Sequence, residues 1–318
     1  MGLDGRYHRP GARSRVAFPA AGAAVATVCG RTPEDSAVFT TLISTADLAE
    51  RLHDPALVVV DVRHDLASPA HWGEERYAAS HIPGARFAHL DRDLSAPMNG
   101  RNGRHPLPAP EQAAEALARL GIGNRSQVVA YDQGSGMFAV RVWWLLRWLG
   151  HDAVAVLDGG FDKWEREGRP VTVEVPQVEP ATFAIGHVGP TLAAADVRRA
   201  LDDGSLSLVD ARAPERFRGE VEPLDPVAGH IPGALNRPFA SNLAPDGTFK
   251  PADVLRREFA ALLGTTPLES VAHYCGSGVS AAHNMLAMEI AGLPGTRLYP
   301  GSWSEWVADE ARPVARGA

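Results

Sequence analysis

Short, continuously apolar segments alternate with amphipathic segments along most of the chain. Between the apolar segments, hydrophobic residues recur every three to four positions, which indicates helices with one buried side. Strands that are apolar on both faces and separated by helices are typical of parallel sheets covered on both sides. The pattern therefore predicts an α/β fold with mostly parallel sheets and helices on both faces. The expected strands are 58–60, 128–130, 154–157 and 271–274, and the expected helices are 47–52, 110–120, 139–149 and 282–291.

The same motifs occur twice in the same order. Asp-Val-Arg at 61–63 corresponds to Asp-Ala-Arg at 210–212, and His-Ile-Pro-Gly-Ala occurs at 81–85 and again at 230–234. Both pairs are separated by 149 positions. A shared offset over two motifs indicates an internal duplication. We therefore predict two domains, 38–174 and 191–312, joined by a proline-containing linker at 175–190.

The first 37 residues differ from the rest in composition. They are rich in Gly, Ala, Arg and Pro, and their weakly apolar stretch lacks the leucines of a signal sequence. We expect a disordered extension over 1–37, with a leader peptide or a misassigned start as the open alternatives.

Charge and cysteine content narrow the classes of partner and the compartment. The net charge of −7 and the pI near 5.9, without a basic helical face, argue against nucleic-acid binding. Apart from the first 37 residues, no segment is long and apolar enough to suggest a membrane span. The two cysteines are Cys29 and Cys275, and Cys29 lies in the unusual N-terminal segment. A structural disulfide is therefore not expected, and a reducing, cytoplasmic location fits best.

Cys275 is the main candidate for chemistry. It follows a strand and begins the small-residue run Cys-Gly-Ser-Gly-Val-Ser-Ala, which leads into a predicted helix. Backbone N–H groups of a tight loop and the N-terminus of a helix favour a thiolate. Strand ends of open α/β sheets are also where ligands bind. These features favour a nucleophile over the alternative, a buried structural cysteine.

The duplication and the loop composition restrict this chemistry. The position of Cys275 is taken by Asp132 in the first half, so only the second half is expected to be catalytic. A cysteine phosphatase needs an arginine at the far end of its loop to pair with phosphate. Here that position is Ala281, and 275–280 contain no basic residue. The loop is suited to sulfur chemistry rather than phosphoryl transfer.

With these motifs, residues 38–312 resemble the tandem-domain rhodanese (sulfurtransferase) family. The resemblance also includes Arg141-Val-Trp-Trp and Gly159-Gly-Phe. It implies two rhodanese domains and a Cys275 persulfide formed from 3-mercaptopyruvate or thiosulfate. Cyanide, a small thiol or reduced thioredoxin would then accept the sulfur, and no metal or organic cofactor would be needed. The loop, which is similar to the Cys-Gly-Ser-Gly-Val-Thr of mercaptopyruvate enzymes, favours 3-mercaptopyruvate as donor.

The resemblance also assigns expected roles within the site. The persulfide would be stabilised by backbone N–H groups of the loop, including those of Gly276, Gly278, Val279 and Ser280. Arg216 would bind the anionic donor. A second substrate arginine is missing from 222–229 unless Arg218 or Arg237 replaces it.

Ser277 would form a proton relay with His81 and an acid, Glu74 or Glu75. His230 occupies the matching position in the second half. A structural role for His81, bracing its turn, is therefore the alternative.

Two other functions remain open at this stage. A persulfide-carrier protein would pass sulfur to partner proteins and turn over small donors slowly. An inactive regulatory rhodanese module would be expected to lack the cysteine, whereas Cys275 is present. Within the enzyme class, a thiosulfate:cyanide sulfurtransferase is the alternative to a mercaptopyruvate enzyme.

Overall fold

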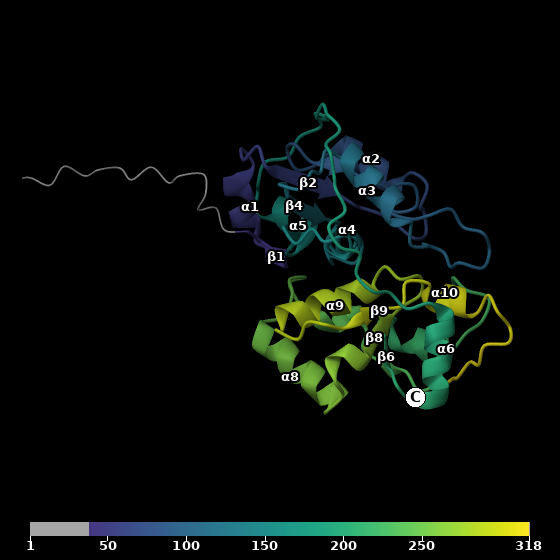
Figure 1. Cartoon of the computed structure of the whole chain (residues 1–318). Coiled ribbons are helices and arrows are strands. Elements are labelled where there is room, and N and C mark those ends of the chain that lie inside the picture. The colour runs from purple at the N-terminus through teal and green to yellow at the C-terminus, as the bar shows by residue number, and fades with distance from the viewer. Residues whose placement is uncertain (1–37, 318) are drawn as a thin grey trace, which may run out of the picture. The chain divides into compact units, whose positions relative to one another are not determined.

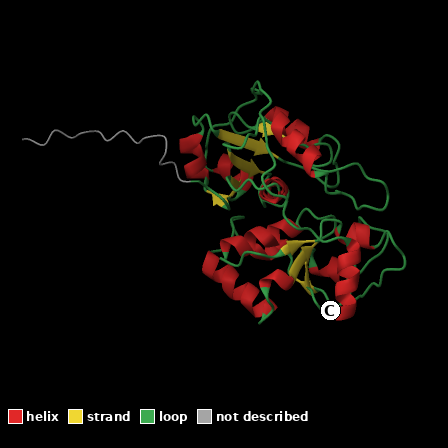
Figure 2. Ribbon diagram, viewed as in Figure 1, coloured by secondary structure: helices red, strands yellow, loops and turns green. Residues whose placement is uncertain are grey.

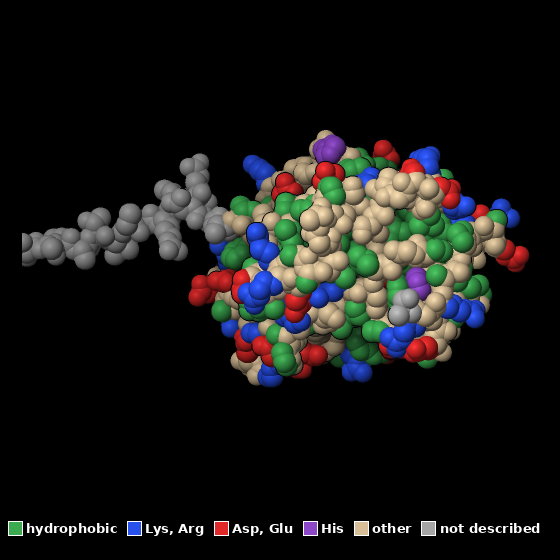
Figure 3. All heavy atoms as spheres, turned by 90° about the horizontal axis from the view of Figure 1, so that it is seen from below, with side chains coloured by type: hydrophobic (Ala, Val, Ile, Leu, Met, Phe, Trp, Pro, Cys, Tyr) green, Lys and Arg blue, Asp and Glu red, His purple; other side chains and the backbone are tan. Residues whose placement is uncertain are grey.

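A computed structural model describes residues 38–317 of the chain. The expectations for the N-terminal extension and for Cys29 concern residues outside this range. No helix among the described residues is long and apolar enough to cross a membrane. On the face shown in Figure 3, Lys and Arg side chains are interspersed with Asp and Glu side chains.

The first half is built around a five-stranded parallel sheet with the strand order β1-β5-β4-β2-β3 (Figure 1). Its elements are β1 (Leu42–Ile43), α1 (Thr45–Arg51), β2 (Leu57–Asp61), α2 (Trp72–Ala79), β3 (Arg86–Phe87), α3 (Pro110–Arg119), β4 (Gln127–Tyr131), α4 (Ala139–Trp148), β5 (Val154–Leu157) and α5 (Gly160–Arg166).

The second half contains a four-stranded parallel sheet with the order β7-β6-β8-β9. Its elements are α6 (Ala194–Asp203), β6 (Ser207–Asp210), α7 (Pro214–Phe217), β7 (Leu235–Asn236), the 3₁₀ helix η2 (Phe239–Asn242), α8 (Ala252–Leu263), the 3₁₀ helix η3 (Leu268–Ser270), β8 (Val271–Tyr274), α9 (Ala281–Ile290), β9 (Arg297–Leu298) and α10 (Ser302–Trp306). The predicted α/β fold with mostly parallel sheets is confirmed.

Both sheets are covered by helices on two sides, as the continuously apolar strands predict (Figure 2). Within β4, Val128 and Ala130 belong to a core cluster with α3 and α4, whereas Val129 and Tyr131 belong to a second cluster with α1 and α5. The residues of β8 divide in the same way between α8 and α9 on one face and α6 and α10 on the other.

Helices α4 and α9 pack together and join the two halves through one continuous apolar cluster. Helix α4 contacts its own sheet on one side and α9 on the other, so nearly all of its residues are buried. This explains why its sequence is apolar around the whole helix rather than along one stripe. Residues 173–193 lead from the first half to the second without a helix or strand.

The duplicated Asp-X-Arg motifs form the same buried ion pair in each half. Arg63 Nη2 contacts Asp61 Oδ2 at 2.7 Å, and Arg212 Nη2 contacts Asp210 Oδ2 at 2.6 Å. Each arginine also donates to a backbone carbonyl, that of Ser80 in the first half and of Gly229 in the second. The motifs therefore brace the ends of β2 and β6.

Candidate active site

Cys275 lies at the carboxyl end of β8, in the loop that leads into α9. Its backbone N–H donates to Ser302 Oγ at 3.1 Å, and its carbonyl accepts from the Trp303 N–H at 3.0 Å. The Gly278 N–H points at the thiol, with an N–Sγ distance of 3.2 Å. The residue is only 2% exposed, so the loop holds its sulfur in one place.

Glycine is required at one position of this loop, and a second glycine lies close to an arginine side chain. Gly278 has φ +79°, and a Cβ there would lie 2.1 Å from the Pro300 carbonyl oxygen. A Cβ on Gly276 would lie 2.8 Å from Nη2 of Arg104. The two glycines therefore allow the backbone of Pro300 and the side chain of Arg104 to approach the loop closely.

Ser302, at the start of α10, has a strained backbone. Its φ is +54°, a left-handed conformation that is unfavourable for a residue with a Cβ. The matching position in the first half is Gly160, with φ +59°. The Ser302 hydroxyl donates to the Tyr299 carbonyl at 2.9 Å and accepts the Cys275 N–H. The strained conformation of Ser302 thus positions its hydroxyl oxygen to accept the backbone N–H of Cys275.

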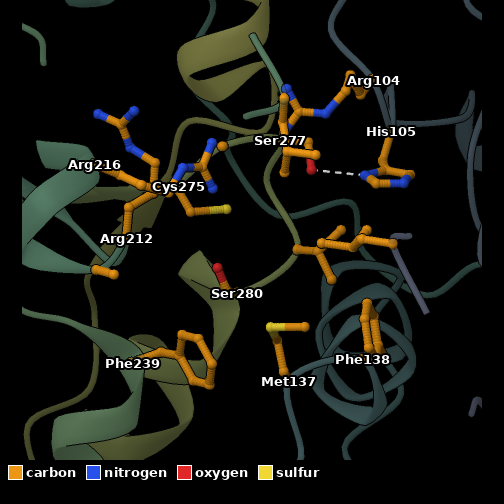
Figure 4. Close-up of a pocket in the computed structure, with 15 residues that line it drawn as sticks. Arg104, His105, Met137, Phe138, Arg212, Arg216, Phe239, Cys275, Ser277 and Ser280 are labelled. Atoms are coloured by element: carbon orange, nitrogen blue, oxygen red, sulfur yellow. Dashed lines mark hydrogen bonds between the residues drawn. The ribbon is translucent and has the colours of Figure 1, made fainter. Parts of the chain in front are cut away.

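A cavity of about 150 Å³ opens in front of Cys275 (Figure 4). Residues of both halves line it, and arginines, apolar side chains and the loop face each other across it. The lining residues are Leu66, Arg104, His105, Met137, Phe138, Arg212, Ala213, Arg216, Leu224, Phe239, Cys275, Gly276, Ser277, Val279 and Ser280.

Ser277 belongs to a hydrogen-bonded chain that crosses between the halves. Its Oγ lies 2.6 Å from Nδ1 of His105, and Nε2 of His105 lies 3.1 Å from Oδ1 of Asp91. With Asp91 accepting from Nε2–H, Nδ1 is free to accept the serine proton. Burial lowers the pKa of His105, and the hydrogen bond with Asp91 opposes this effect. The neutral imidazole, which can act as a base, is thereby favoured.

The expectation that His81 pairs with Ser277 is wrong. Nδ1 of His81 lies 2.7 Å from the Tyr77 carbonyl oxygen, Nε2 lies 3.1 Å from that of Glu174, and the ring stacks on Tyr77. The side chain is fully buried in its own turn. His81 therefore has the structural role that was the alternative.

The acids expected beside His81 also lie elsewhere. Glu74 pairs with Arg92 at the surface, and Glu75 is an exposed residue of α2. Asp91 takes the acidic position in the chain of hydrogen bonds instead.

Arg216 lines the cavity, and Arg104 of the first half lines it as well. Nη2 of Arg216 contacts Glu222 at 2.6 Å and Asp225 at 3.5 Å. Arg104 forms an ion pair with the same Asp225. Desolvation raises the pKa of Asp225, and Arg104 opposes this shift. Both guanidinium groups approach the loop at Gly276.

Neither arginine named as a replacement reaches the cavity. Arg218 pairs with Glu220 on the surface, and Arg237 binds Asn242 and Glu258. The segment 222–229 contains no second arginine, and Arg104 of the first half lies in the cavity instead.

Another, fully buried cation lies behind the loop. Arg141 of α4 donates to the carbonyls of Leu94, His105 and Gly278, at 3.2, 3.3 and 3.4 Å. Burial lowers the pKa of Arg141 to about 10, and its electrostatic interaction with Cys275 opposes that shift. Arg141 thus ties the loop of the second half to the segment that carries His105.

Sequence reasoning missed Asp91, Arg104 and His105. They lie in a polar region between β3 and α3 that has no repeated motif. Arg104 and His105 have partners more than a hundred residues away, and Asp91 contacts His105. The sequence offered one indication: the segment 222–229 has no second substrate arginine, which implied that another part of the chain supplies this cation.

Comparison with known proteins assigns the family. The rhodanese-like domain matches twice, at residues 44–167 and 193–309. The chain belongs to the rhodanese family. Its two-domain organisation confirms the predicted tandem rhodanese.

Two curated proteins and one solved structure illustrate the relationship of this rhodanese to others. A probable 3-mercaptopyruvate sulfurtransferase of Pseudomonas aeruginosa is 49% identical over 280 residues, which cover 87% of this chain and 98% of the relative. A putative thiosulfate sulfurtransferase of Mycobacterium tuberculosis is 40% identical, with 87% and 97% covered. The crystal structure of a 3-mercaptopyruvate sulfotransferase of Escherichia coli superposes with a TM-score of 0.70 at 32% identity, with 83% and 99% covered. The predicted sulfurtransferase class is confirmed.

Proposed function

We propose that this rhodanese transfers a sulfane sulfur from 3-mercaptopyruvate through a persulfide on Cys275, with thiosulfate as a second donor. The observation that carries the proposal is the chain Ser277–His105–Asp91, which ends in the same cavity as the Cys275 loop. A thiol donor has to lose a proton during transfer, whereas thiosulfate has no thiol proton. A proton relay at this position therefore favours the thiol donor.

The transfer balances with the residues present. The Cys275 thiolate attacks the sulfur of 3-mercaptopyruvate, an S–S bond forms, and the C–S bond breaks with its electron pair on carbon. The proton of the donor thiol passes through Ser277 and His105 and ends on the carbon of the leaving group, which departs as pyruvate. In the second step, cyanide or a thiolate attacks the outer sulfur and regenerates the Cys275 thiolate.

We assign the binding of the donor carboxylate to Arg104 and Arg216. Both guanidinium groups lie near Gly276, and together they contact the buried Asp225. Asp225 keeps the two cations in place while no donor is bound, and a substrate carboxylate can share their remaining N–H groups. The N–H groups of Gly276, Gly278, Val279 and Ser280 would stabilise the negative charge of the persulfide.

A small thiol or reduced thioredoxin is the acceptor that we favour over cyanide in the cell, because thiols are abundant in a reducing compartment. We place the reaction in the cytoplasm, where a persulfide enzyme with a free catalytic thiol remains reduced. Leu66 and Leu224 line the cavity and are 37% and 39% exposed, so an acceptor with an apolar surface could contact them.

Mass spectrometry tests the proposal directly. The full chain is incubated with 3-mercaptopyruvate, without an acceptor, and alkylated under mild conditions. An added mass of about 32 Da on the Cys275 peptide, absent from Cys275→Ser and removed by cyanide, is the expected result. If neither 3-mercaptopyruvate nor thiosulfate gives this adduct, the proposed function is wrong.

A further inference from the structure

Three potential metal ligands meet beside the cavity: His64, Asp91 and His105. Each offers one ligand atom, and these atoms all lie within 4.8 Å of one another. Asp91 and His105 are already in contact, with 3.1 Å between Oδ1 and Nε2. His64 follows β2 directly, whereas the other two lie between β3 and α3, so the group joins separate parts of the first half.

His64 has no role in the hydrogen-bonded chain, and its Nε2 is buried without a hydrogen-bond partner among residues 38–317. The residue is only 7% exposed, and its ring lies edge-on to that of His105, with 6.4 Å between centroids. A buried imidazole nitrogen with this geometry can act as a metal ligand. An unpaired polar atom in such a place is unfavourable unless a ligand satisfies it.

The neighbouring His89 is not available in this way. Its Nε2 lies 3.1 Å from the Pro69 carbonyl oxygen, and its Nδ1 accepts the backbone N–H of Asp91. Both ring nitrogens are therefore occupied, which fixes the loop that carries Asp91 and leaves His64 as the free imidazole of the group.

We propose that His64, Asp91 and His105 form a Zn²⁺ site that regulates the enzyme. Two imidazole nitrogens and one carboxylate oxygen are a ligand set that zinc favours, with a fourth position open to water. Ca²⁺ and Mg²⁺ prefer oxygen ligands and are disfavoured here. A movement of the side chains by about 1 Å brings atoms at these separations to the zinc–ligand distances of about 2.0–2.2 Å.

Zinc at this site would change which nitrogen of His105 carries the proton and so block proton transfer from Ser277. This effect rests on the proposed function. A metal on Nε2 of His105 takes the lone pair there and places the ring proton on Nδ1. Nδ1 then donates to Ser277 and can no longer accept its proton. Turnover of 3-mercaptopyruvate should stop, whereas thiosulfate, which has no thiol proton, should still be used.

Binding is tested first, in a form that excludes the cysteine thiolate as the zinc ligand. Full-length Cys275→Ser is titrated with Zn²⁺ against a chromophoric chelator and compared with the double variant that also carries His64→Ala. His71→Ala, at a histidine whose side chain is 75% exposed, is the matched control. We expect the single variant and the control to bind equally, and His64→Ala to weaken one site by at least tenfold.

Equal zinc affinity with and without His64, or loss of the site in Cys275→Ser alone, would overturn the proposal. If His64→Ala does not fold, as judged by circular dichroism, His64→Gln gives the same comparison with a residue closer in size. The outcome is then read from that variant in the same way.

Regulation is tested with the wild-type enzyme at free Zn²⁺ concentrations fixed by a metal buffer. We expect kcat for 3-mercaptopyruvate to fall at least tenfold, kcat for thiosulfate to change less than twofold, and a chelator to restore the activity. His64→Ala should remove the inhibition and leave the zinc-free rate unchanged. Equal inhibition with both donors, or inhibition that persists in His64→Ala, would overturn the regulatory role. An enzyme inactive on both donors without zinc would instead contradict the proposed function.

Discussion

Asp132 and Cys275 occupy the same position in the two halves, each at the end of a central strand and before a helix. The carboxylate of Asp132 accepts the N–H groups of Gly136 at 2.9 Å and Phe138 at 2.8 Å. In the second half, the Gly278 N–H lies 3.2 Å from Sγ of Cys275. Gly136 and Gly278 have nearly the same φ, +76° and +79°. The loop is thus an anion-binding cradle in both halves.

This relationship suggests what the loop of the second half binds. An aspartate oxygen is two bonds from Cβ, as is the outer sulfur of a cysteine persulfide. The carboxylate of Asp132 therefore occupies the place that the persulfide charge would take on Cys275. In the first half the carboxylate of Asp132 fills the cradle, so this loop has no thiol that could carry a persulfide.

Removal of the Asp132 carboxylate should destabilise the first half. Asp132→Ala leaves several buried N–H groups without an acceptor, and each such group costs about 1–3 kcal/mol. We expect a loss of about 3 kcal/mol or more in the free energy of unfolding, measured by urea denaturation. Burial raises the pKa of Asp132, which shows that burying its negative charge is unfavourable. Asp132→Asn, which keeps an acceptor oxygen without the charge, should therefore lower the free energy of unfolding less than Asp132→Ala does. Equal stability of Asp132→Ala and the wild type would contradict the role of the cradle.

Loss of the proton relay should affect the two donors differently. In Ser277→Ala and His105→Gln, kcat for 3-mercaptopyruvate should fall by about 10²–10⁴-fold, the usual contribution of a positioned acid or base. Thiosulfate turnover should change by less than threefold, because no proton is transferred from that donor. His81→Gln is the control: it should lower stability without changing the ratio of the two activities. A parallel loss with both donors would contradict the relay.

The central elements were predictable because they are long and regular. Strand β5 and strand β8 have the expected bounds, and α3, α4 and α9 differ from their predicted ranges by one residue at one or both ends. The two-residue strands β1, β3, β7 and β9 were missed, since two residues show no periodicity. Their pairing depends on the neighbouring strand rather than on their own sequence.

The site was only partly predictable, for a related reason. The loop from Cys275 to Ser280 is contiguous, so its strand–loop–helix context could be read directly. His105 reaches Ser277 across 172 positions, and no local pattern records such a contact. The family resemblance favoured the wrong histidine, whereas the duplication pointed to the structural role that His81 has. His230 stacks on Phe217 as His81 stacks on Tyr77, which shows that the shared motif braces a turn in each half.

Arg104 should stabilise the bound donor by the free energy of a charge-assisted hydrogen bond. Arg104→Ala is expected to raise KM for 3-mercaptopyruvate by about 10–100-fold, which corresponds to about 1.5–3 kcal/mol. Arg104→Lys should recover only part of this loss, since a lysine cannot form the bidentate contact. Arg218→Ala, which removes an arginine paired at the surface, is the matched control and should leave KM unchanged. An unchanged KM in Arg104→Ala would exclude this residue from the binding of the donor.

Ser302 offers a test of strain against hydrogen bonding. Ser302→Ala keeps the unfavourable φ and leaves the Cys275 N–H without its acceptor, whereas Ser302→Gly loses the acceptor but relieves the strain. We expect both variants to lower kcat, with the alanine variant about 1 kcal/mol less stable than the glycine variant. Steady-state kinetics and urea denaturation measure the two effects. If the alanine variant is the more stable, the backbone strain has been misjudged.

His273 should make the stability of the protein sensitive to acid. It lies fully buried in β8, neither ring nitrogen has a hydrogen-bond partner in the described part of the chain, and desolvation lowers its pKa to about 3. Since the unfolded chain takes up the proton near pH 6.5, stability is fully present above that pH and declines as the pH falls toward 3. One such histidine adds about 1.4 kcal/mol per pH unit to the slope in this window.

Replacement of His273 by leucine removes this titration and should flatten the decline by the same amount. Urea denaturation of wild type and His273→Leu at pH 7, 6, 5 and 4 measures the difference. His64 and His283, whose pKa values burial lowers to about 4, continue to titrate in both proteins and therefore cancel in the comparison. We expect the two stability curves to diverge below pH 6.5, and parallel curves would show that His273 does not remain neutral in the folded protein.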